Sequence, residues 1–137
     1  MNPQIRFGEE QALLRAEARR WLDEHFPIAR VRELADSEAG EDPSDWKQLA
    51  ELGWLGLVVP ESHGGAELGA TDLAVLMEET GRRLLPSPLL PATLAALALV
   101  ADGSDAQRER FLPAIAAGEI RALYAGSASV WGASSAD

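Results

Sequence analysis

Apolar side chains recur along most of the chain at the three- and four-residue spacing that is typical of amphipathic helices. In the first such stretch, Leu14, Ala18 and Leu22 fall on one helical face, while Arg15 and Arg19 fall on the opposite, polar face. The same kind of spacing predicts amphipathic helices over residues 9–26, 28–36, 43–52, 71–85 and 105–117.

The stretch from Pro86 to Asp102 differs from these helices because it has no polar face. Ser87 is placed to cap a helix here, and Pro88 suits the first helical position. A helix that is apolar all round is typical of a protein interior, and this one is shorter than the roughly 20 residues of a membrane span. We therefore expect a buried central helix against which the amphipathic helices pack.

Residue types at two other predicted helix starts support the boundaries. Asp42 and Pro43 suit the cap and the first residue of one helix, and Ser104 with Gln107 has the pattern of a capping box. These signals fix where the helices over residues 43–52 and 105–117 begin.

Two segments depart from helical spacing. Residues 54–69 are apolar and then glycine-rich, which predicts a loop partly tucked into the core, and Gly64 with Gly65 predicts a turn with positive φ. Residues 119–125 (EIRALYA) lack a helical period and predict the start of a β-strand. The predicted fold is all-α: an orthogonal or irregular bundle of about six helices around one apolar central helix, with a strand beginning near the C-terminus.

Charge and composition exclude several classes of protein. The chain has 137 residues, a formal net charge of −10 and no cysteine. The negative charge would repel nucleic acid and anionic membrane surfaces. The lack of cysteine excludes disulfides, thiolate metal sites and thiol nucleophiles. We see no apolar signal-peptide segment and expect a cytoplasmic protein.

No complete catalytic or metal-binding constellation is visible in the sequence. The histidines are His25 and His63, and only His63, beside two glycines, lies in a plausible functional loop. There is no G-x-S-x-G elbow and no glycine-rich phosphate fingerprint. Glu78 and Glu79 are candidates for acid–base work, but neighbouring helical residues point about 100° apart. We expect them to form ion pairs with arginines four residues further on, on a solvated face.

Four blocks of sequence, taken together, resemble a known family. They are WKQLAELGWLGLVVPESHGG, then DLAVLMEETGRRL, then the apolar helix, then GSDAQRERFLPAIAAGEIRALYA. Each block is weak alone, but their order and spacing over about residues 5–125 resemble the N-terminal helical domain of acyl-CoA dehydrogenases.

The resemblance implies a fold and a chemistry. Members of this family are flavoproteins that use FAD to oxidise acyl-CoA thioesters to 2-enoyl-CoA. They have an N-terminal helical domain, a middle β-domain and a C-terminal four-helix bundle, usually in tetramers. For this chain the resemblance implies a helical domain over residues 1–118, and the first strand and loop of a truncated middle domain over residues 119–137.

The same resemblance implies which parts of the reaction this chain can serve. The family's catalytic base is a glutamate, usually in the C-terminal bundle, and most FAD contacts come from the middle and C-terminal domains. We therefore expect no catalytic residue here and no FAD bound by this chain alone. The implied partners are an acyl-CoA substrate, an electron-transfer flavoprotein or another acceptor, and further subunits of a homo- or hetero-oligomer.

What the N-terminal domain supplies in this family is one wall of the acyl pocket. The uncharged helix suits that role, because an alkyl chain gains about 0.8 kcal/mol per buried CH₂ only against an apolar wall. By rough alignment, the resemblance places Thr93, Ala96 and Leu97 near that wall.

A flavin contact is implied further along the chain. Tyr124 and Ser127 match the first half of a segment that lies beside the flavin ring in the family, with Ser129 as the alternative to Ser127. The Glu-Pro that normally follows this segment is missing from this sequence.

Three hypotheses follow from the sequence. The chain is the N-terminal portion of a flavin-dependent acyl-CoA dehydrogenase, or a non-catalytic helical partner subunit of a larger flavoprotein complex. Alternatively, it is a helical domain that binds an apolar ligand and has no link to oxidation. The four blocks favour the first hypothesis.

Overall fold

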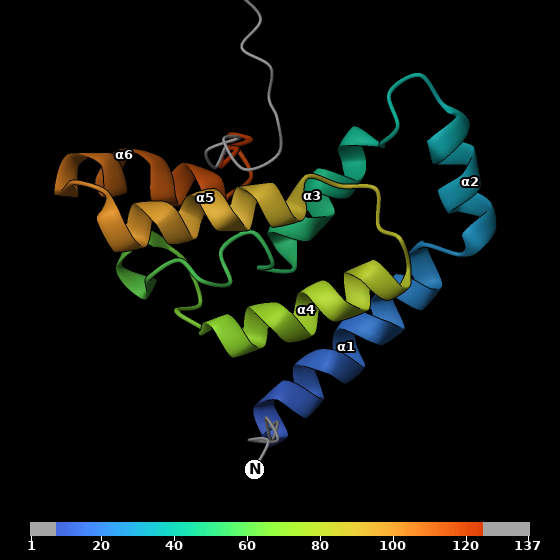
Figure 1. The fold of residues 1–137 in the computed structure, drawn as a ribbon, viewed down its shortest axis with the longest axis horizontal. Helices are drawn as coiled ribbons and strands as arrows, with labels where there is room; N and C mark the ends of the chain where they lie inside the picture. Colours follow the sequence, from blue (N-terminus) through green and yellow to red (C-terminus); the bar gives the residue numbers. More distant parts are fainter. Residues whose placement is uncertain (1–7, 125–137) are drawn as a thin grey trace, which may run out of the picture.

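The computed structural model describes residues 8–124, which form six α-helices and one short 3₁₀ helix (Figure 1). The elements are α1 (Glu9–His25), α2 (Ile28–Asp36), α3 (Pro43–Glu51), η1 (Glu61–His63), α4 (Ala70–Arg82), α5 (Leu89–Asp102) and α6 (Asp105–Ala116). The predicted all-α class is confirmed for this part of the chain.

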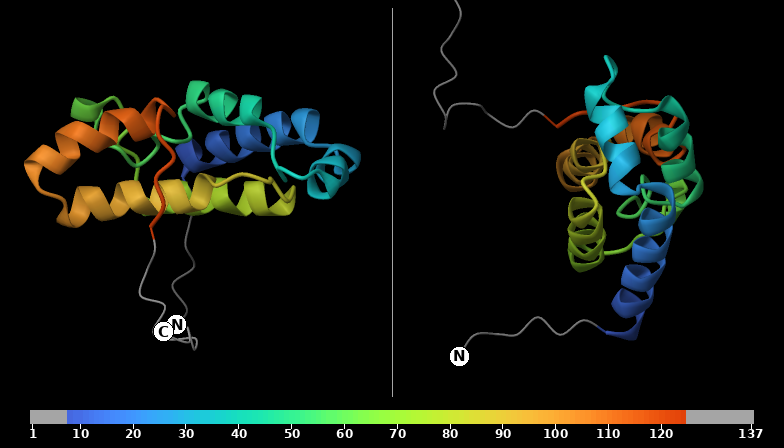
Figure 2. Two further views of the ribbon diagram at one scale, coloured as in Figure 1. Left: turned by 90° about the horizontal axis from the view of Figure 1, so that it is seen from above. Right: turned by 90° about the vertical axis from the view of Figure 1, so that its right-hand side faces the viewer.

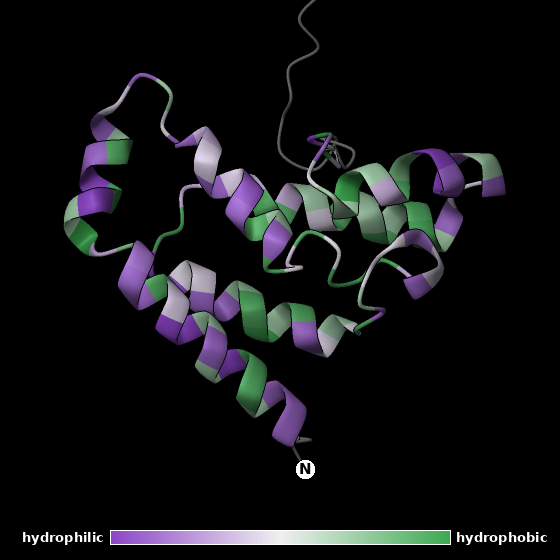
Figure 3. Ribbon diagram, turned by 180° about the vertical axis from the view of Figure 1, so that it is seen from behind, coloured by the Kyte–Doolittle hydropathy of each residue, from purple (hydrophilic) through white to green (hydrophobic). Residues whose placement is uncertain are grey.

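Two helix pairs organise the molecule. Helix α1 lies alongside α4, and α5 lies alongside α6, although the members of the first pair are far apart in sequence (Figure 1). Helix α2 lies at one end of the molecule, as two perpendicular views agree (Figures 1 and 2). Hydrophilic residues dominate α2 and the outer turns of α1 (Figure 3).

The core is completed by the loop between α3 and α4. Trp54, Leu55, Leu57, Val58 and Val59 are all buried, so the loop is tucked into the interior as its sequence predicts. The helices supply the remaining apolar core residues: Ala18, Leu22, Phe26, Val31, Trp46, Leu49, Leu73, Leu76, Leu89, Ala92, Ala96, Leu112 and Ile115.

Two of the three predicted helix caps are present, at α3 and α6, while the predicted cap at Ser87 is not formed because Pro88 holds the N-cap position of α5. Asp42 Oδ1 accepts a hydrogen bond from the backbone N–H of Ser44 at 2.8 Å at the start of α3. At the start of α6, Ser104 Oγ accepts from the Gln107 N–H at 3.3 Å, and Gln107 Oε1 accepts from the Ser104 N–H at 2.9 Å. This reciprocal pair is the capping box read from the sequence.

Of the two loop glycines, only Gly64 adopts the expected positive φ, at 82°. Gly65 is required for a different reason. A Cβ atom at Gly65 would lie 2.0 Å from the carbonyl oxygen of Val59, so only glycine permits this close backbone approach.

The expected strand is not formed over residues 119–124. A turn at Gly118, with φ 71°, ends the helical part, and the Gly118 carbonyl accepts a hydrogen bond from Trp46 Nε1 at 2.9 Å. Residues 121–124 then run across α5, where the Tyr124 N–H donates to the Pro91 carbonyl at 3.4 Å. A strand needs a neighbouring strand to pair with, and residues 8–124 contain none. The division of the chain at residue 118 stays a prediction.

Helix α5 is buried on one face rather than all round. Leu89, Ala92 and Ala96 are buried, but Leu90 is 45% exposed and Leu94 is 38% exposed. Helix α5 lies at the edge of the helical domain (Figure 2). Its inner face packs on the core residues of the other helices, and its outer face has no such contact among the described residues. The expectation of a fully buried central helix is therefore wrong for residues 8–124.

Candidate functional site

The outer face of α5 is the most conspicuous apolar surface in the described part of the chain. Leu90 and Leu94 are exposed one helical turn apart, and Leu97 is half-buried further along. No charged side chain interrupts the sequence between Arg83 and Asp102. This uncharged face is the candidate functional site.

A groove of about 220 Å³ continues this face at the start of α5. It lies between the end of α4, the connection that follows, and the first turn of α5. Its lining residues are Met77, Thr80, Gly81, Leu84, Leu85, Ser87, Leu89 and Leu90. Because Leu90 belongs both to this groove and to the outer face, the two form one continuous surface.

The structure buries two of the three predicted wall residues on the inner side of the helix. Thr93 and Ala96 are fully buried, and Thr93 Oγ1 donates to the Leu90 carbonyl at 2.9 Å. Leu97 is half-buried and packs against the core. The open face of the helix consists of Leu90 and Leu94, while Thr93 and Ala96 are buried behind it. A contact of any of these residues with an acyl group stays a prediction.

Of the two predicted flavin contacts, Tyr124 lies among the described residues. Tyr124 is exposed and lines a pocket of about 270 Å³ between α5 and α6, with Leu99, Ile115 and Leu123 among its other walls. This pocket is apolar, and no glycine-rich loop in residues 8–124 is placed to hold a phosphate there. Ser127 and its alternative Ser129 lie outside the described residues, so the predicted flavin contact stays a prediction.

The histidines take part in local contacts. His63 Nδ1 lies 3.0 Å from Ser62 Oγ in η1. His25 Nδ1 lies 2.9 Å from the Trp21 carbonyl oxygen, and the His25 ring stacks on the Trp21 ring with centroids 4.4 Å apart. Over residues 8–124 there is no group of three His, Asp or Glu side chains that could hold a metal ion.

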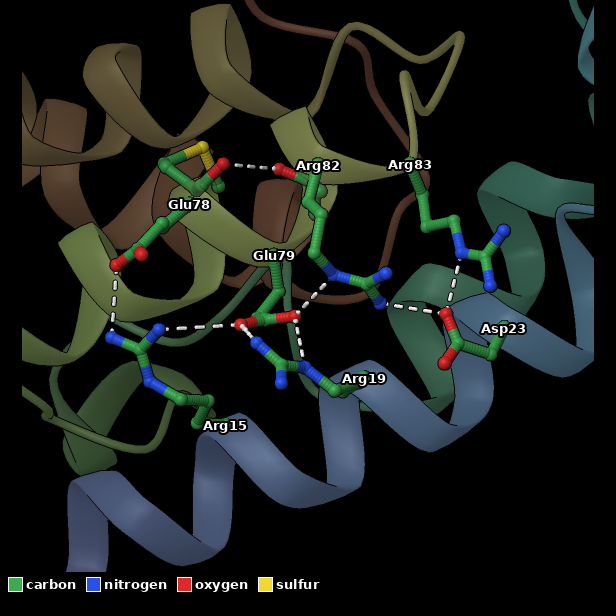
Figure 4. A network of polar contacts seen from close by, with 9 residues as sticks. Arg15, Arg19, Asp23, Glu78, Glu79, Arg82 and Arg83 are labelled. Atoms are coloured by element: carbon green, nitrogen blue, oxygen red, sulfur yellow. Dashed lines mark hydrogen bonds and ion pairs between the residues drawn. The ribbon is translucent and has the colours of Figure 1, made fainter. Parts of the chain in front are cut away.

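A network of carboxylates and arginines joins α1 to α4 (Figure 4). The Glu79 carboxylate is 1% exposed, and its oxygens accept hydrogen bonds from Arg19 at 2.8 and 3.0 Å. They also accept from Arg82 at 2.9 Å and from Arg15 at 3.3 Å. The ion pair expected between Glu79 and an arginine four residues further on is therefore wrong, since Glu79 is buried and its partners come mainly from α1.

The same network continues at the surface. Arg15 pairs with Glu78 at 2.8 Å, and Arg82 and Arg83 both pair with Asp23. The polar face of α1 is thus turned toward α4 and not toward solvent alone. The spacing of α1 reveals that these residues share a face, but it cannot reveal which helix they meet.

These contacts lower the pKa values of the carboxyl groups. The hydrogen bond from Arg19, followed by that from Arg82, lowers the pKa of Glu79 despite its burial, which acts in the opposite direction. Arg15 lowers the pKa of Glu78, and Arg83 with Arg82 lowers the pKa of Asp23. The lowered pKa values favour the ionised form of all three carboxyl groups, which suits their role as ion-pair partners between α1 and α4.

The helices of residues 8–124 are all too short or too polar to cross a membrane.

The fold and this uncharged face define a helical domain, and comparison with known proteins gives its family. The sequence profile of "Acyl-CoA dehydrogenase, N-terminal domain" matches residues 8–119. The chain belongs to the acyl-CoA dehydrogenase family, as its four sequence blocks predict.

Individual relatives agree with this assignment. "Acyl-CoA dehydrogenase IpdE2" of Mycolicibacterium smegmatis is 42% identical over 97 residues, which cover 70% of this chain and 31% of that protein. Among solved structures, the "Tcur3481-Tcur3483 steroid ACAD G363A variant" shares the fold with a TM-score of 0.76 and 41% identity, over 83% of this chain and 31% of that one. The ChsE4-ChsE5 complex from Mycobacterium tuberculosis follows with a TM-score of 0.70 and 29% identity, over 86% of this chain and 30% of that one.

The chain spans about a third of the length of the curated relatives that it matches first. The matched part is the helical domain, and the structure gives a role to residues in two of the four sequence blocks. In DLAVLMEETGRRL, Glu79 and Arg82 are members of the buried network. In the block ending PESHGG, Gly65 makes the close approach to Val59.

Proposed function

We propose that this chain is the N-terminal portion of a flavin-dependent acyl-CoA dehydrogenase and that the outer face of α5 is one wall of its acyl site. The whole protein would oxidise an acyl-CoA thioester to a 2-enoyl-CoA. The observation that supports the proposal is the exposure of Leu90 and Leu94 on a helix with no charged side chain before its last residue.

The energetics favour an acyl group as the occupant of this face. Exposed leucines gain nothing from water, whereas an alkyl chain laid against them gains about 0.8 kcal/mol for each CH₂ that it buries. A charged or strongly polar ligand would find no partner along α5, because its outer face offers only aliphatic side chains. The chemistry of this face therefore suits the apolar part of an acyl-CoA.

The remaining parts of the reaction belong to the whole protein in this proposal. FAD would bind mainly through residues outside this chain, with Tyr124 and Ser127 as its proposed contacts here, and it would supply the oxidising centre. Thr93, Ala96 and Leu97 would support the wall from behind, since Thr93 and Ala96 are buried beneath it. An electron-transfer flavoprotein or another acceptor, further subunits, and a cytoplasmic location complete the proposal.

A binding experiment on the 137-residue chain tests the wall. Decanoyl-CoA is titrated into the ¹⁵N-labelled chain, and amide shifts are followed by NMR. We expect the shifts to concentrate along α5 and to be lost in Leu94→Asp, which places a charge on the exposed face. Leu13→Asp is the matched control, because Leu13 is exposed on α1. Equal loss of binding in both variants, or no shift along α5 in the wild type, would contradict the proposal.

A second candidate function is a non-catalytic helical partner subunit. The neighbour described as a complex of ChsE4 and ChsE5 supports it, because two different chains associate there. In that case the outer face of α5 would bind a larger flavoprotein subunit. Decanoyl-CoA would then cause no amide shifts along α5 even in the wild-type chain. Leu94→Asp would instead weaken the association of the chain with that subunit.

A further inference from the structure

A pocket of about 320 Å³ lies between α1 and the loop that joins α3 to α4. This volume is within the range of small-molecule sites. Much of its wall is apolar and includes Trp21 of α1, Leu52 at the end of α3, and Trp54, Leu57 and Leu68 of the loop. The pocket shares no lining residue with the outer face of α5 or with the groove at the start of that helix. It is therefore a separate feature of the domain.

Two side chains of opposite charge line the same pocket. Glu17 and Arg20 both lie on α1, three residues apart, and both are exposed. Residues at this spacing are neighbours on a helix surface. Neither side chain forms an ion pair or a hydrogen bond within the part of the chain that the structure describes. Over residues 8–124 the pocket thus presents an unpaired cation and an unpaired anion beside its apolar walls.

The arginine that precedes this one has a different role. Arg19 pairs with Glu79 of α4 at 2.8 Å and so belongs to the network that fastens α1 to α4. Arg20 follows Arg19 directly, and successive helical residues project about 100° apart, so its side chain leaves the network and lies at the pocket. The charge of Arg20 is therefore available to a ligand, whereas that of Arg19 is used by the fold.

We propose that this pocket binds a free α-amino acid with a large apolar side chain. The α-carboxylate accepts hydrogen bonds from the Arg20 guanidinium, whose planar fork matches a carboxylate. The α-ammonium group donates to the Glu17 carboxylate. The side chain of the amino acid lies between Trp21 and the apolar residues of the loop. This inference does not rest on the proposed function, because it uses none of the residues of α5.

The two charges select a zwitterion over other apolar ligands. A simple carboxylate attracted to Arg20 is repelled by Glu17, and a simple amine attracted to Glu17 is repelled by Arg20. An α-amino acid carries both charges on neighbouring atoms, so it satisfies both side chains at once. The apolar walls favour a large aliphatic or aromatic side chain, because the affinity gained from burial grows with the apolar area removed from water. Trp21 and Trp54, whose rings meet edge to face at 5.3 Å, supply much of that area.

Titration of L-phenylalanine into the ¹⁵N-labelled 137-residue chain tests the site. The indole N–H signals of Trp21 and Trp54 report on the pocket, because both residues line it. Trp46 is the internal reference, since it does not line the pocket and its Nε1–H donates to the Gly118 carbonyl at 2.9 Å. We expect saturable shifts at Trp21 and Trp54 and no shift at Trp46.

Three analogues separate the contributions of the ligand groups. 3-Phenylpropanoate lacks the ammonium group, phenethylamine lacks the carboxylate, and glycine lacks the apolar side chain. We expect the first two to bind about 3- to 5-fold more weakly than L-phenylalanine, as the loss of one exposed ion pair implies, and glycine to cause no shift.

Two substitutions connect these preferences to the pocket. Glu17→Gln should abolish the preference for L-phenylalanine over 3-phenylpropanoate, and Arg20→Gln should abolish the preference over phenethylamine. Glu24→Gln on α1 and Arg32→Gln on α2 are the matched controls, because both residues are exposed and neither lines the pocket. Both preferences should survive in the controls.

Several results would overturn the inference. These are the absence of saturable shifts at Trp21 and Trp54, shifts of the same size at Trp46, and equal affinity of the wild-type chain for L-phenylalanine and its two charged analogues. Preferences that persist in Glu17→Gln and Arg20→Gln would also overturn it. The comparison of analogues on the wild-type chain stays decisive even where a variant fails to fold. None of these results bears on the proposed function, which the decanoyl-CoA titration of α5 tests separately.

Discussion

At the scale of single residues, Glu79 shows what sequence spacing can and cannot predict. The four-residue spacing predicts pairing of Glu79 with Arg83, but the structure pairs Arg83 with Asp23, and Glu79 instead accepts from Arg82 at 2.9 Å. The strongest partner is Arg19 of α1, sixty residues earlier in the chain. Local rules contain no information about which distant helix packs on a given face, so the burial of Glu79 could not be predicted.

Removing the Glu79 carboxylate should destabilise the fold. Glu79→Ala leaves the guanidinium groups of Arg15, Arg19 and Arg82 without their shared acceptor at the α1–α4 contact. We expect the free energy of unfolding to fall by about 2 kcal/mol, measured by urea denaturation. Glu78→Ala is the control, because the Glu78 side chain is 63% exposed and a surface ion pair adds little. Equal losses in the two variants would contradict the central role of Glu79.

At the scale of elements, helix positions follow closely from the sequence because their ends carry local signals. The helix predicted over residues 28–36 has those bounds, and two of the three predicted caps, at Asp42 and Ser104, form, whereas the one at Ser87 does not. Helix α5 shows the limit of this approach. Its composition predicts burial, but composition cannot say whether the cover comes from the same chain. Residues 8–124 cover one face and leave Leu90 and Leu94 open.

The loop between α3 and α4 should depend on glycine at one position. The loop folds back so that the Gly65 N–H donates to the Pro60 carbonyl at 3.1 Å, while its Cα lies against Val59. Gly65→Ala would drive a methyl group into the Val59 backbone, and we expect a loss of about 2 kcal/mol or more, or failure to fold.

A matched glycine substitution provides the control for Gly65→Ala. Gly81 lies within α4, and a Cβ atom there would meet nothing within 4 Å. Gly81→Ala should therefore raise stability by about 0.5–1 kcal/mol, since alanine favours the helix. Thermal unfolding of both variants by circular dichroism is the measurement. Similar Tm shifts of the same sign would show that the close approach at Gly65 does not constrain the fold.

At the scale of the whole molecule, the sequence predicts the family and the class of fold, but not which residues of α5 are open. The rough alignment selects Thr93, Ala96 and Leu97 along this helix, and a role of these residues in an acyl site stays a prediction. Which residues of a helix are open depends on the placement of every neighbouring element. Only the assembled structure shows that Leu90 and Leu94 face outward and that Ser87 is left unpartnered beside them.

The stability of the whole domain should fall at acidic pH. The pKa values of Glu79, Glu78 and Asp23 are lowered in the folded state, so the unfolded chain binds more protons as the pH decreases. The stabilisation is complete above the ordinary carboxyl range, about pH 5, and is lost as the pH falls through the lowered pKa values.

Urea midpoints measured between pH 7 and pH 3 check this dependence. Glu79→Gln removes the titrating group and should flatten the curve, while Glu33→Gln makes the same charge change on α2, outside the network. A wild-type midpoint that stays constant down to pH 3 would contradict the expectation, as would equal flattening by both substitutions.

The pairing of α1 with α4 also has a consequence for the newly made chain. The arginines of α1 leave the ribosome about sixty residues before Glu79, which at about 5–20 residues per second is a delay of several seconds. During that interval α1 can meet Trp54 of the loop after α3, on which Trp21 packs, but not the carboxylates of α4. The ion pairs that Arg15 and Arg19 make with Glu79 can therefore form only after α4 has been synthesised.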